Sequence, residues 1–129
     1  MRISFTEREL DIMTVLWTRG PSTVAEVREA IADELAYTTV LTVLRTLEEK
    51  GYAGHTEEGK AYRYLPLVDR EQAGASALDR MLGTLFLGQP ELLLTQLVDE
   101  RGLSRSELER LRRLLDERLA EPGEPGDGR

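Results

Sequence analysis

The stretch LAYTTVLTVLRTLEEKGYAGHTEEGKAYRYLPLV, residues 35–68, decides the fold. Its first half spaces apolar residues three and four apart and ends at Gly51, which predicts a helix over about residues 37–50. The β-branched residues at the start of this helix have low helix propensity, so packing has to hold it. Its second half has two short runs rich in Tyr and Thr around a glycine-containing turn. This pattern predicts a β-hairpin that Pro66 closes.

Two more helices are predicted before this stretch. Thr6 with Glu9, and Thr23 with Glu26, form capping-box pairs that mark helix starts. Three helices followed by a hairpin give the order of a winged helix-turn-helix, in which Ser22 is expected to supply a short third strand. The expected core positions on the three helices, all at helical spacing, are Ile12, Met13, Leu16, Trp17, Val24, Val27, Ile31, Leu35, Val40, Val43, Leu44 and Leu47.

The chain changes character after Pro66. Helix starts are predicted at Asp69, at Pro90 and at Ser104, the last with Glu107 as a capping box. These helices are too short and too apolar to close a core by themselves, and a second copy of the chain is their simplest partner. The residues expected in the dimer interface are Leu78, Met81, Leu82, Leu85, Phe86, Leu93, Leu97, Leu108, Leu111 and Leu115.

The expected architecture is mainly α-helical with a small β wing. A winged helix-turn-helix DNA-binding domain over residues 1–68 is followed by a helical dimerisation domain over residues 69–120. The tail at residues 121–129 is acidic and rich in Pro and Gly, which predicts disorder.

The composition of the chain excludes several classes of function. The 129 residues include 17 Lys and Arg against 24 Asp and Glu, a formal net charge of −7, with one His and no Cys. Disulfides and thiolate sites are excluded, and no nucleotide-binding or nucleophile motif occurs. We therefore expect no enzyme activity, no metal and no cofactor. No apolar run is long enough to span a bilayer and no secretory signal is visible, so we expect a cytoplasmic protein without membrane insertion.

Three segments resemble the penicillinase-repressor (BlaI/MecI/CopY) family of winged-helix repressors. TVAEVREAI at 23–31, AYTTVLTVLRTLEEKG at 36–51 and GKAYRYLPLV at 59–68 follow its second helix, recognition helix and wing in order. LSRSELERLRRLLDE at 103–117 is similar to its dimerisation tail, so the resemblance covers about residues 4–120. It implies a homodimeric repressor that binds a dyad operator in double-stranded DNA, often controlling antibiotic-resistance or stress genes. It also makes a membrane-bound sensor protease a plausible partner.

The resemblance assigns roles to single residues. Thr38, Thr39 and Thr42 fall where the family's recognition helix enters the major groove, with Tyr37 at the helix start near phosphates. Lys60 falls where a basic wing residue contacts the DNA backbone.

Three further basic residues are expected at the DNA. Arg45 either binds guanine through two hydrogen bonds or pairs with Glu49 at i+4. Lys50 and Arg63 are expected to hold the phosphate backbone, and His55 is interpreted as a surface residue of a strand.

The sequence also departs from the family pattern. Arg45 lies one place before the usual Arg, with Thr46 and Leu47 in the slot that the family fills with Arg and Leu. The Asn–Phe bond cut in staphylococcal-type members is matched here by the bond between Gln96 and Leu97, the candidate cleavage position. Copper-sensing members carry C-terminal Cys pairs, and with no Cys in this chain direct copper sensing is excluded.

The charge balance predicts little electrostatic attraction between this chain and DNA. Residues 35–65 carry four basic and four acidic side chains, so this segment is neutral within a chain of net charge −7. We therefore expect weak non-specific binding to DNA and a DNA affinity that depends little on salt concentration. Operator recognition should then rely on operator shape, hydroxyl contacts and dimer geometry. Two alternatives remain open: a winged-helix module that binds protein, and a regulator that a small molecule releases from DNA by binding between the helical and winged domains.

Overall fold

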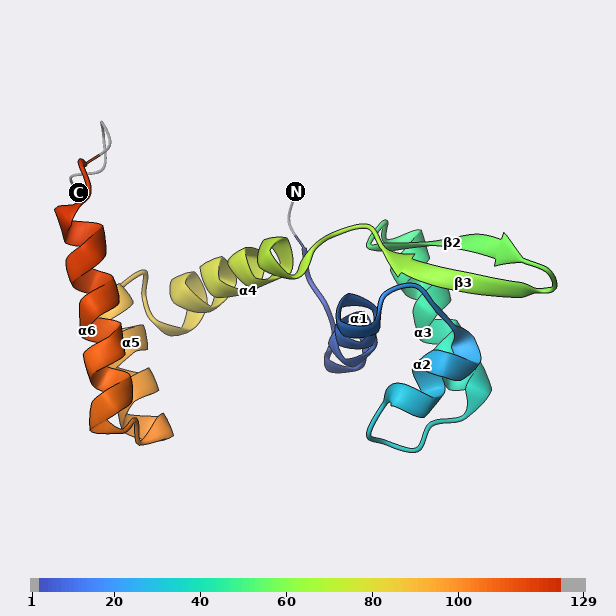
Figure 1. Ribbon diagram of the computed structural model, residues 1–129, viewed down its shortest axis with the longest axis horizontal. Helices are drawn as coiled ribbons and strands as arrows, with labels where there is room; N and C mark the ends of the chain where they lie inside the picture. Colours follow the sequence, from blue (N-terminus) through green and yellow to red (C-terminus); the bar gives the residue numbers. More distant parts are fainter. Residues whose placement is uncertain (1–2, 124–129) are drawn as a thin grey trace. The chain divides into compact units, whose positions relative to one another are not determined.

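The elements occur in the predicted order in the computed structural model, which describes residues 3–123 (Figure 1). The chain divides into two compact units, Met1–Met81 and Leu82–Arg129. Of the predicted tail, residues 124–129 lie outside the described residues. The elements are α1 (Glu7–Arg19), β1 (Ser22–Thr23), α2 (Val24–Ala30), α3 (Tyr37–Glu49), β2 (Ala53–Glu58), β3 (Ala61–Pro66), α4 (Arg70–Leu85), α5 (Pro90–Arg101) and α6 (Arg105–Ala120).

Local sequence signals set the helix ends. The three predicted capping boxes are present. The hydroxyls of Thr6, Thr23 and Ser104 each accept a hydrogen bond from the backbone N–H of the Glu three residues on. The carboxylate of that Glu in turn accepts a hydrogen bond from the backbone N–H of the capping residue. After α3, the backbone N–H of Tyr52 donates to the carbonyl of Leu47 at 2.9 Å, across Gly51 at φ +85°. A positive φ suits glycine, so the predicted end of this helix is confirmed.

The sheet has three antiparallel strands in the order β1-β3-β2. Ser22 pairs with Tyr64 and supplies the predicted short strand, while His55 faces Tyr64 from the other side. Glu58 pairs with Ala61, which leaves Gly59 and Lys60 as a two-residue turn. Gly59 has φ +65°, as the first central position of a type II′ hairpin turn requires.

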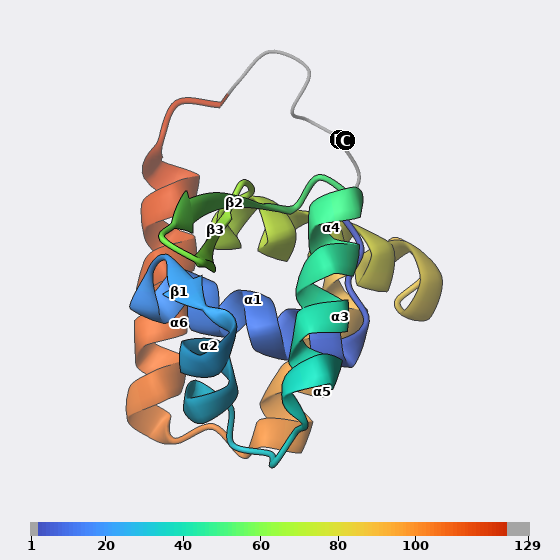
Figure 2. The same cartoon turned by 90° about the vertical axis from the view of Figure 1, so that its right-hand side faces the viewer.

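The core of the first unit lies where α1, α2 and α3 meet under the sheet (Figure 2). Each helix contributes one apolar face, as the spacing of the sequence predicts, and Tyr64 of β3 fills the centre at 1% exposure. Trp17 is partly buried, and its indole N–H donates to the carbonyl of Val68 at 2.9 Å, which anchors the chain that leaves the sheet. The buried apolar residues are Ile3, Ile12, Met13, Leu16, Val24, Val27, Val40, Leu44, Leu47, Tyr52, Ala53, Tyr64, Val68 and Ala73.

The helix α4 begins in the first unit. Ala73 is buried in its core, and the backbone N–H of Ile3 donates to the Ser76 hydroxyl at 3.4 Å. The first compact unit therefore runs on to Met81, whereas the predicted domain boundary lies at residue 68. The difference arises because Ala73 and the hydroxyl of Ser76 attach the first turns of α4 to the first unit. Neither residue contributes to a periodic apolar pattern in the sequence.

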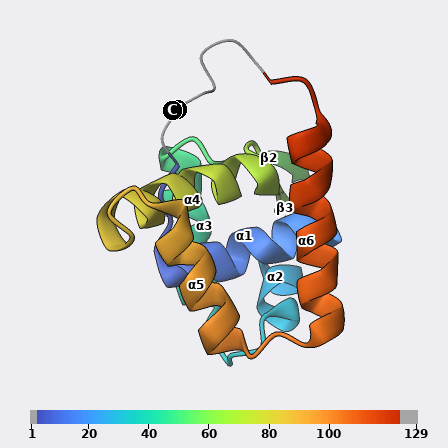
Figure 3. The same cartoon turned by 90° about the vertical axis from the view of Figure 1, so that its left-hand side faces the viewer.

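The second unit consists of the end of α4 followed by α5 and α6. These two helices run in opposite directions from a turn at Gly102, which has φ +57° (Figure 3). Neither α5 nor α6 has a buried residue, although both are rich in leucine. No helix within residues 3–123 has the length and hydropathy needed to cross a bilayer.

An ion pair joins α1 to the end of α3. The Nζ of Lys50 lies 2.7 Å from Oε2 of Glu9, whose side chain is 5% exposed against 40% for the lysine. Burial raises the pKa of the Glu9 carboxyl, but the hydrogen bonds from Lys50 and from the backbone of Thr6 outweigh it. The pKa therefore lies below its ordinary value. Glu9 thus caps α1 and holds α3 with the same carboxylate.

Replacing Lys50 with Met is expected to lower the free energy of unfolding by about 1–2 kcal/mol at pH 7, because the buried carboxylate loses its cation. A carboxyl with a lowered pKa stabilises the folded state above its unfolded pKa of 4.5, so the difference between wild type and K50M should shrink as the pH falls below 4.5. Urea unfolding at one protein concentration, at pH 7 and at roughly pH 3, measures it.

The matched control is K60M, which removes an exposed lysine from the same unit and should change stability by less than about 0.5 kcal/mol. Equal stability of K50M and wild type at pH 7 would show that this ion pair does not stabilise the fold.

Candidate nucleic-acid interface

The outer face of α3 is the first part of the interface. Val40, Leu44 and Leu47 point into the core and Leu41 and Val43 pack against it, so the opposite face of the helix is exposed to solvent. This face is rich in hydroxyl groups and contains no carboxylate before Glu48. The sequence-predicted DNA contacts that it exposes are Tyr37, Thr38, Thr39, Thr42 and Arg45.

The hydroxyl of Thr42 has a fixed orientation. It donates to the backbone carbonyl of Thr38 at 2.9 Å, and Thr46 bonds to Thr42 in the same way at 3.0 Å. With its proton used inside the helix, Thr42 offers its methyl group and the lone pairs of its oxygen. A methyl group suits the C5-methyl of thymine, and the lone pairs suit an amino group on a base edge.

The start of α3 differs from the starts of α1, α2 and α6. Its N-cap is Ala36, which provides no side-chain hydrogen bond, and the first turn contains no acidic residue. The other three helices have a glutamate in the first turn. The positive end of the α3 dipole is therefore not neutralised by its own side chains.

A groove of about 400 Å³ lies between α3, the start of α2 and β3. Tyr37 and Arg45 line it from the helix and Lys60 from the turn of the hairpin, so three of the predicted contact residues share one concave surface.

The hairpin is fixed to α3 through His55, for which the sequence predicts a surface position on a strand. Nδ1 of His55 lies 2.7 Å from a carboxylate oxygen of Glu48, near the end of α3. The imidazole stacks on Tyr62 with ring centroids 4.2 Å apart and an interplanar angle of 19°. The Glu48 and His55 side chains therefore connect the wing to the predicted recognition helix.

The structure places Lys50 and Arg63 in ion pairs with other parts of the fold. Lys50 binds Glu9, as described above. Arg63 lies 2.9 Å from Glu26, the capping residue of α2, and 2.8 Å from Glu58 of β2. The hydrogen bond to Glu58 raises the pKa of Arg63, and the pKa of Glu26 is lowered by the backbone N–H of Thr23 and then by Arg63. The partners are up to 41 residues away in sequence, so spacing gives no signal for them.

Arg45 and Lys60 remain as cations that form no ion pair with any residue in 3–123. The pairing of Arg45 with Glu49, one of its two predicted roles, is therefore not formed. The interface offers hydroxyls, methyl groups, two unpaired cations and an uncapped helix start. This set can bind a polyanion and read base edges.

Nowhere in the described part of the chain do three or more His, Asp or Glu side chains converge so that they could hold a metal ion.

Comparison with known proteins places these features in a family. Residues 5–117 match the family model described as "Penicillinase repressor". The transcriptional regulator BlaI of Mycobacterium tuberculosis is 34% identical over 113 residues, which cover 84% of this chain and 80% of BlaI. The penicillinase repressor of Bacillus licheniformis is 24% identical, covering 87% of this chain and 89% of its own length. The methicillin resistance regulatory protein MecI of Staphylococcus aureus is 21% identical, covering 85% of this chain and 91% of MecI.

Solved structures show the same fold. A point mutant of MarR from E. coli superposes with a TM-score of 0.51 at 14% identity, over 90% of this chain and 79% of the MarR chain. The transcriptional regulator Tm0710 from Thermotoga maritima gives 0.50 at 18% identity, over 91% and 80%. These likenesses confirm the predicted winged-helix fold, and the regulators found by sequence agree with the expectation that the chain is not an enzyme. The family match over 113 of its 129 residues shows that this chain belongs to the penicillinase repressor family.

Proposed function

We propose that this protein represses transcription by binding a dyad operator as a homodimer, with α3 in the major groove and the hairpin on the neighbouring phosphates. Membership of the penicillinase repressor family supports the repressor role. The observation that carries the DNA contact is the outer face of α3, which exposes threonines and Arg45, with Arg45 lining one groove together with Lys60 of the hairpin turn. Two such helices would enter successive major grooves about 34 Å apart.

The proposed contacts divide into two kinds. Thr38, Thr39, Thr42 and Arg45 read bases, with Arg45 available for guanine because Glu49 does not hold it. Tyr37 and Lys60 hold the backbone, where the uncapped start of α3 adds a favourable dipole.

Lys50 and Arg63, the remaining predicted backbone contacts, are already bound to carboxylates. They can reach phosphates only by giving up these ion pairs, so we propose that they position α3 and the wing instead.

We propose that α4, α5 and α6 form the dimer interface. Most of the predicted interface residues are exposed in the single chain, among them Leu78, Leu85 and Leu115 at 50%, 71% and 52%. Apolar surface of this extent needs a partner: α5 and α6 bury none of their own residues, and α4 buries only Ala73 in its first turns. Residues 69–120 thus serve dimerisation, with the first turns of α4 also packed into the first unit.

The candidate cleavage bond between Gln96 and Leu97 lies inside α5. A cut there would separate α6 and half of α5 from the DNA-binding unit, and with them Leu108, Leu111 and Leu115. Because the bond is in the middle of a helix, cleavage by a sensor protease requires local opening of α5 first.

Replacing Thr39 with Glu should weaken operator binding at least about 100-fold, because a carboxylate on the outer face of α3 would meet phosphates and acceptor-rich base edges. The dimer should persist, since Thr39 lies outside the leucine-rich helices. Gel retardation with the chain's own upstream DNA and sedimentation of the free protein test both statements. T18E, an exposed threonine of α1, is the matched control. An affinity of T39E equal to wild type would refute the role of α3.

The salt dependence of operator binding should be shallow. With Arg45 and Lys60 from each of two protomers, a plot of log K against log salt should have a slope of about −4 or less steep. Titrations at several salt concentrations give the slope. A slope steeper than about −6 would show that Lys50 and Arg63 also leave their carboxylates for the DNA.

Replacing Leu115 with Glu should raise the dimer dissociation constant at least about 100-fold, because a carboxylate would be buried in the apolar interface. The control R113E places the same group on the opposite face of α6. Analytical ultracentrifugation measures both. A dimer of L115E as strong as that of wild type would rule out this face of α6 as the interface.

A further inference from the structure

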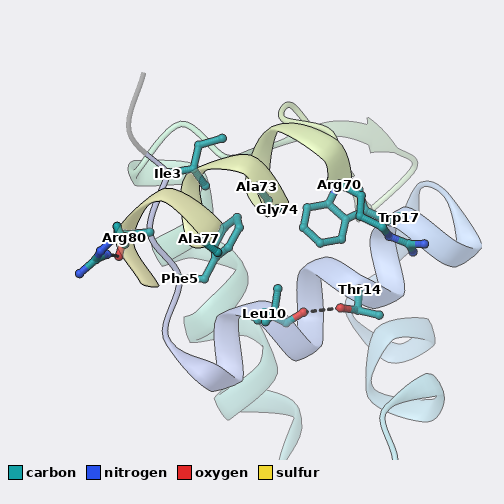
Figure 4. A pocket seen from close by; sticks show the side chains of 11 residues that line it. Ile3, Phe5, Leu10, Thr14, Trp17, Arg70, Ala73, Gly74, Ala77 and Arg80 are labelled. Carbon is teal, nitrogen blue, oxygen red and sulfur yellow. Dashed lines mark hydrogen bonds between the residues drawn. The ribbon is translucent and has the colours of Figure 1, made fainter. Parts of the chain in front are cut away.

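A pocket of about 440 Å³ lies within the first unit, away from the DNA-binding groove (Figure 4). Its walls are the segment before α1, the outer side of α1 and the first turns of α4. The volume lies within the range of pockets that bind small organic molecules. Neither the packing of the core nor the proposed DNA contact uses this space.

The walls of the pocket are largely apolar and aromatic. Phe5 and Trp17 meet edge to face, with ring centroids 6.1 Å apart, and Leu10 completes the α1 side at 45% exposure. On the opposite side α4 presents Ala73 and Ala77 (Figure 4). Two aromatic rings facing small side chains leave a space suited to a flat apolar group.

Gly74 keeps this space open. A Cβ built at this position meets no atom within 4 Å, so contact with neighbouring atoms does not require glycine here. Glycine in a helix interior costs about 1 kcal/mol relative to alanine. The helix therefore carries a destabilising residue at the wall of the pocket where packing would accept a larger one.

Arg70 gives the pocket a charged end. Its guanidinium carbon lies 5.8 Å from the centroid of the Trp17 ring, and a guanidinium nitrogen donates to the Thr18 hydroxyl at 3.1 Å. Within residues 3–123 it forms no ion pair, whereas Arg8, Arg19 and Arg63 of the same unit each bind a carboxylate. An arginine without a carboxylate partner beside an apolar pocket is complementary to an organic anion.

We propose that this pocket binds a flat aromatic carboxylic acid, with its rings between the Phe5 and Trp17 side and α4 and its carboxylate on Arg70. The ligand would contact α1, which packs on α3, and also α4, which continues beyond Met81 into the second unit. It would thereby act on the junction between the helix proposed to bind DNA and the helices proposed to dimerise.

The test uses the full-length protein and 2-naphthoate as the probe. Trp17 is the one tryptophan of the chain, so the indole N–H gives a single side-chain signal in a ¹H–¹⁵N spectrum that reports on the pocket. Addition of 2-naphthoate should shift this signal in a saturable way. The neutral analogue 2-naphthamide should bind about tenfold more weakly, because it cannot form a charge-assisted bond with Arg70. The assay contains no DNA, so its result is independent of operator binding.

Three variants separate this site from general apolar adsorption. R70Q should lose the preference for the acid over the amide. G74L should weaken 2-naphthoate binding at least about tenfold by filling the space. G83L, the same change in the same helix outside the pocket, should bind like wild type. Backbone amide signals as widely dispersed as those of wild type in the same spectrum show that each variant is folded.

The absence of an indole shift at millimolar 2-naphthoate would overturn the proposal, and so would equal affinity for acid and amide in the wild-type protein. Wild-type affinity in folded G74L would place the ligand elsewhere, with the exposed leucines of α5 and α6 as the alternative surface. If G74L does not fold, the test is the ratio of the affinities for 2-naphthoate and 2-naphthamide, compared between R70Q and wild type. An equal ratio in the two proteins would overturn the proposal.

Discussion

Two glutamates that cap helices also bind cations from distant elements, and the geometry of the DNA-binding unit depends on this double use. Glu9 caps α1 and holds Lys50 at the end of α3, while Glu26 caps α2 and holds Arg63 of β3. Each carboxylate thus ties a local helix start to an element about 40 residues further along the chain. The cost of burying Glu9 is offset because its oxygens receive both a backbone N–H and an ammonium.

This arrangement has a consequence for DNA recognition by an acidic protein. Half of the basic residues between positions 35 and 65 stabilise the fold, so the exposed binding surface has few unpaired cations. A surface of this kind supplies little of the non-specific phosphate attraction on which many DNA-binding proteins rely. In the proposed complex, discrimination would then depend on short-range contacts of threonine methyl and hydroxyl groups, and on the spacing that the proposed dimer imposes.

The helix α4 has a buried beginning and an exposed apolar end. Its first turns are packed into the first unit through Ala73 and Ser76, and its later turns expose Leu78, Met81 and Leu85. On the proposal above, a ligand in the pocket would act on the first turns of α4, and the helix would carry this effect toward Leu78 and Met81, because a helix is stiff over this length. The apolar pocket beside Gly74 lies where such a change would begin.

Much of the molecule could be predicted from the sequence, because the signals are local. Capping pairs at Thr6, Thr23 and Ser104, the apolar spacing of the helices, Gly51 and the Tyr-rich hairpin each act over a few residues, and all lie where they were predicted. The fold class and the family followed from these patterns, and so did the outward face of α3.

Tertiary structure alone decided which charges are available at the surface. Lys50 and Arg63 look equivalent to Arg45 and Lys60 in the sequence, yet the first two are bound to carboxylates and the last two form no ion pair in the described chain. The link between His55 and Glu48 and the pocket between α1 and α4 were likewise absent from any sequence pattern. The physical reason is that an ion pair or a cavity depends on distance in space, and residues many positions apart meet only when the core has folded.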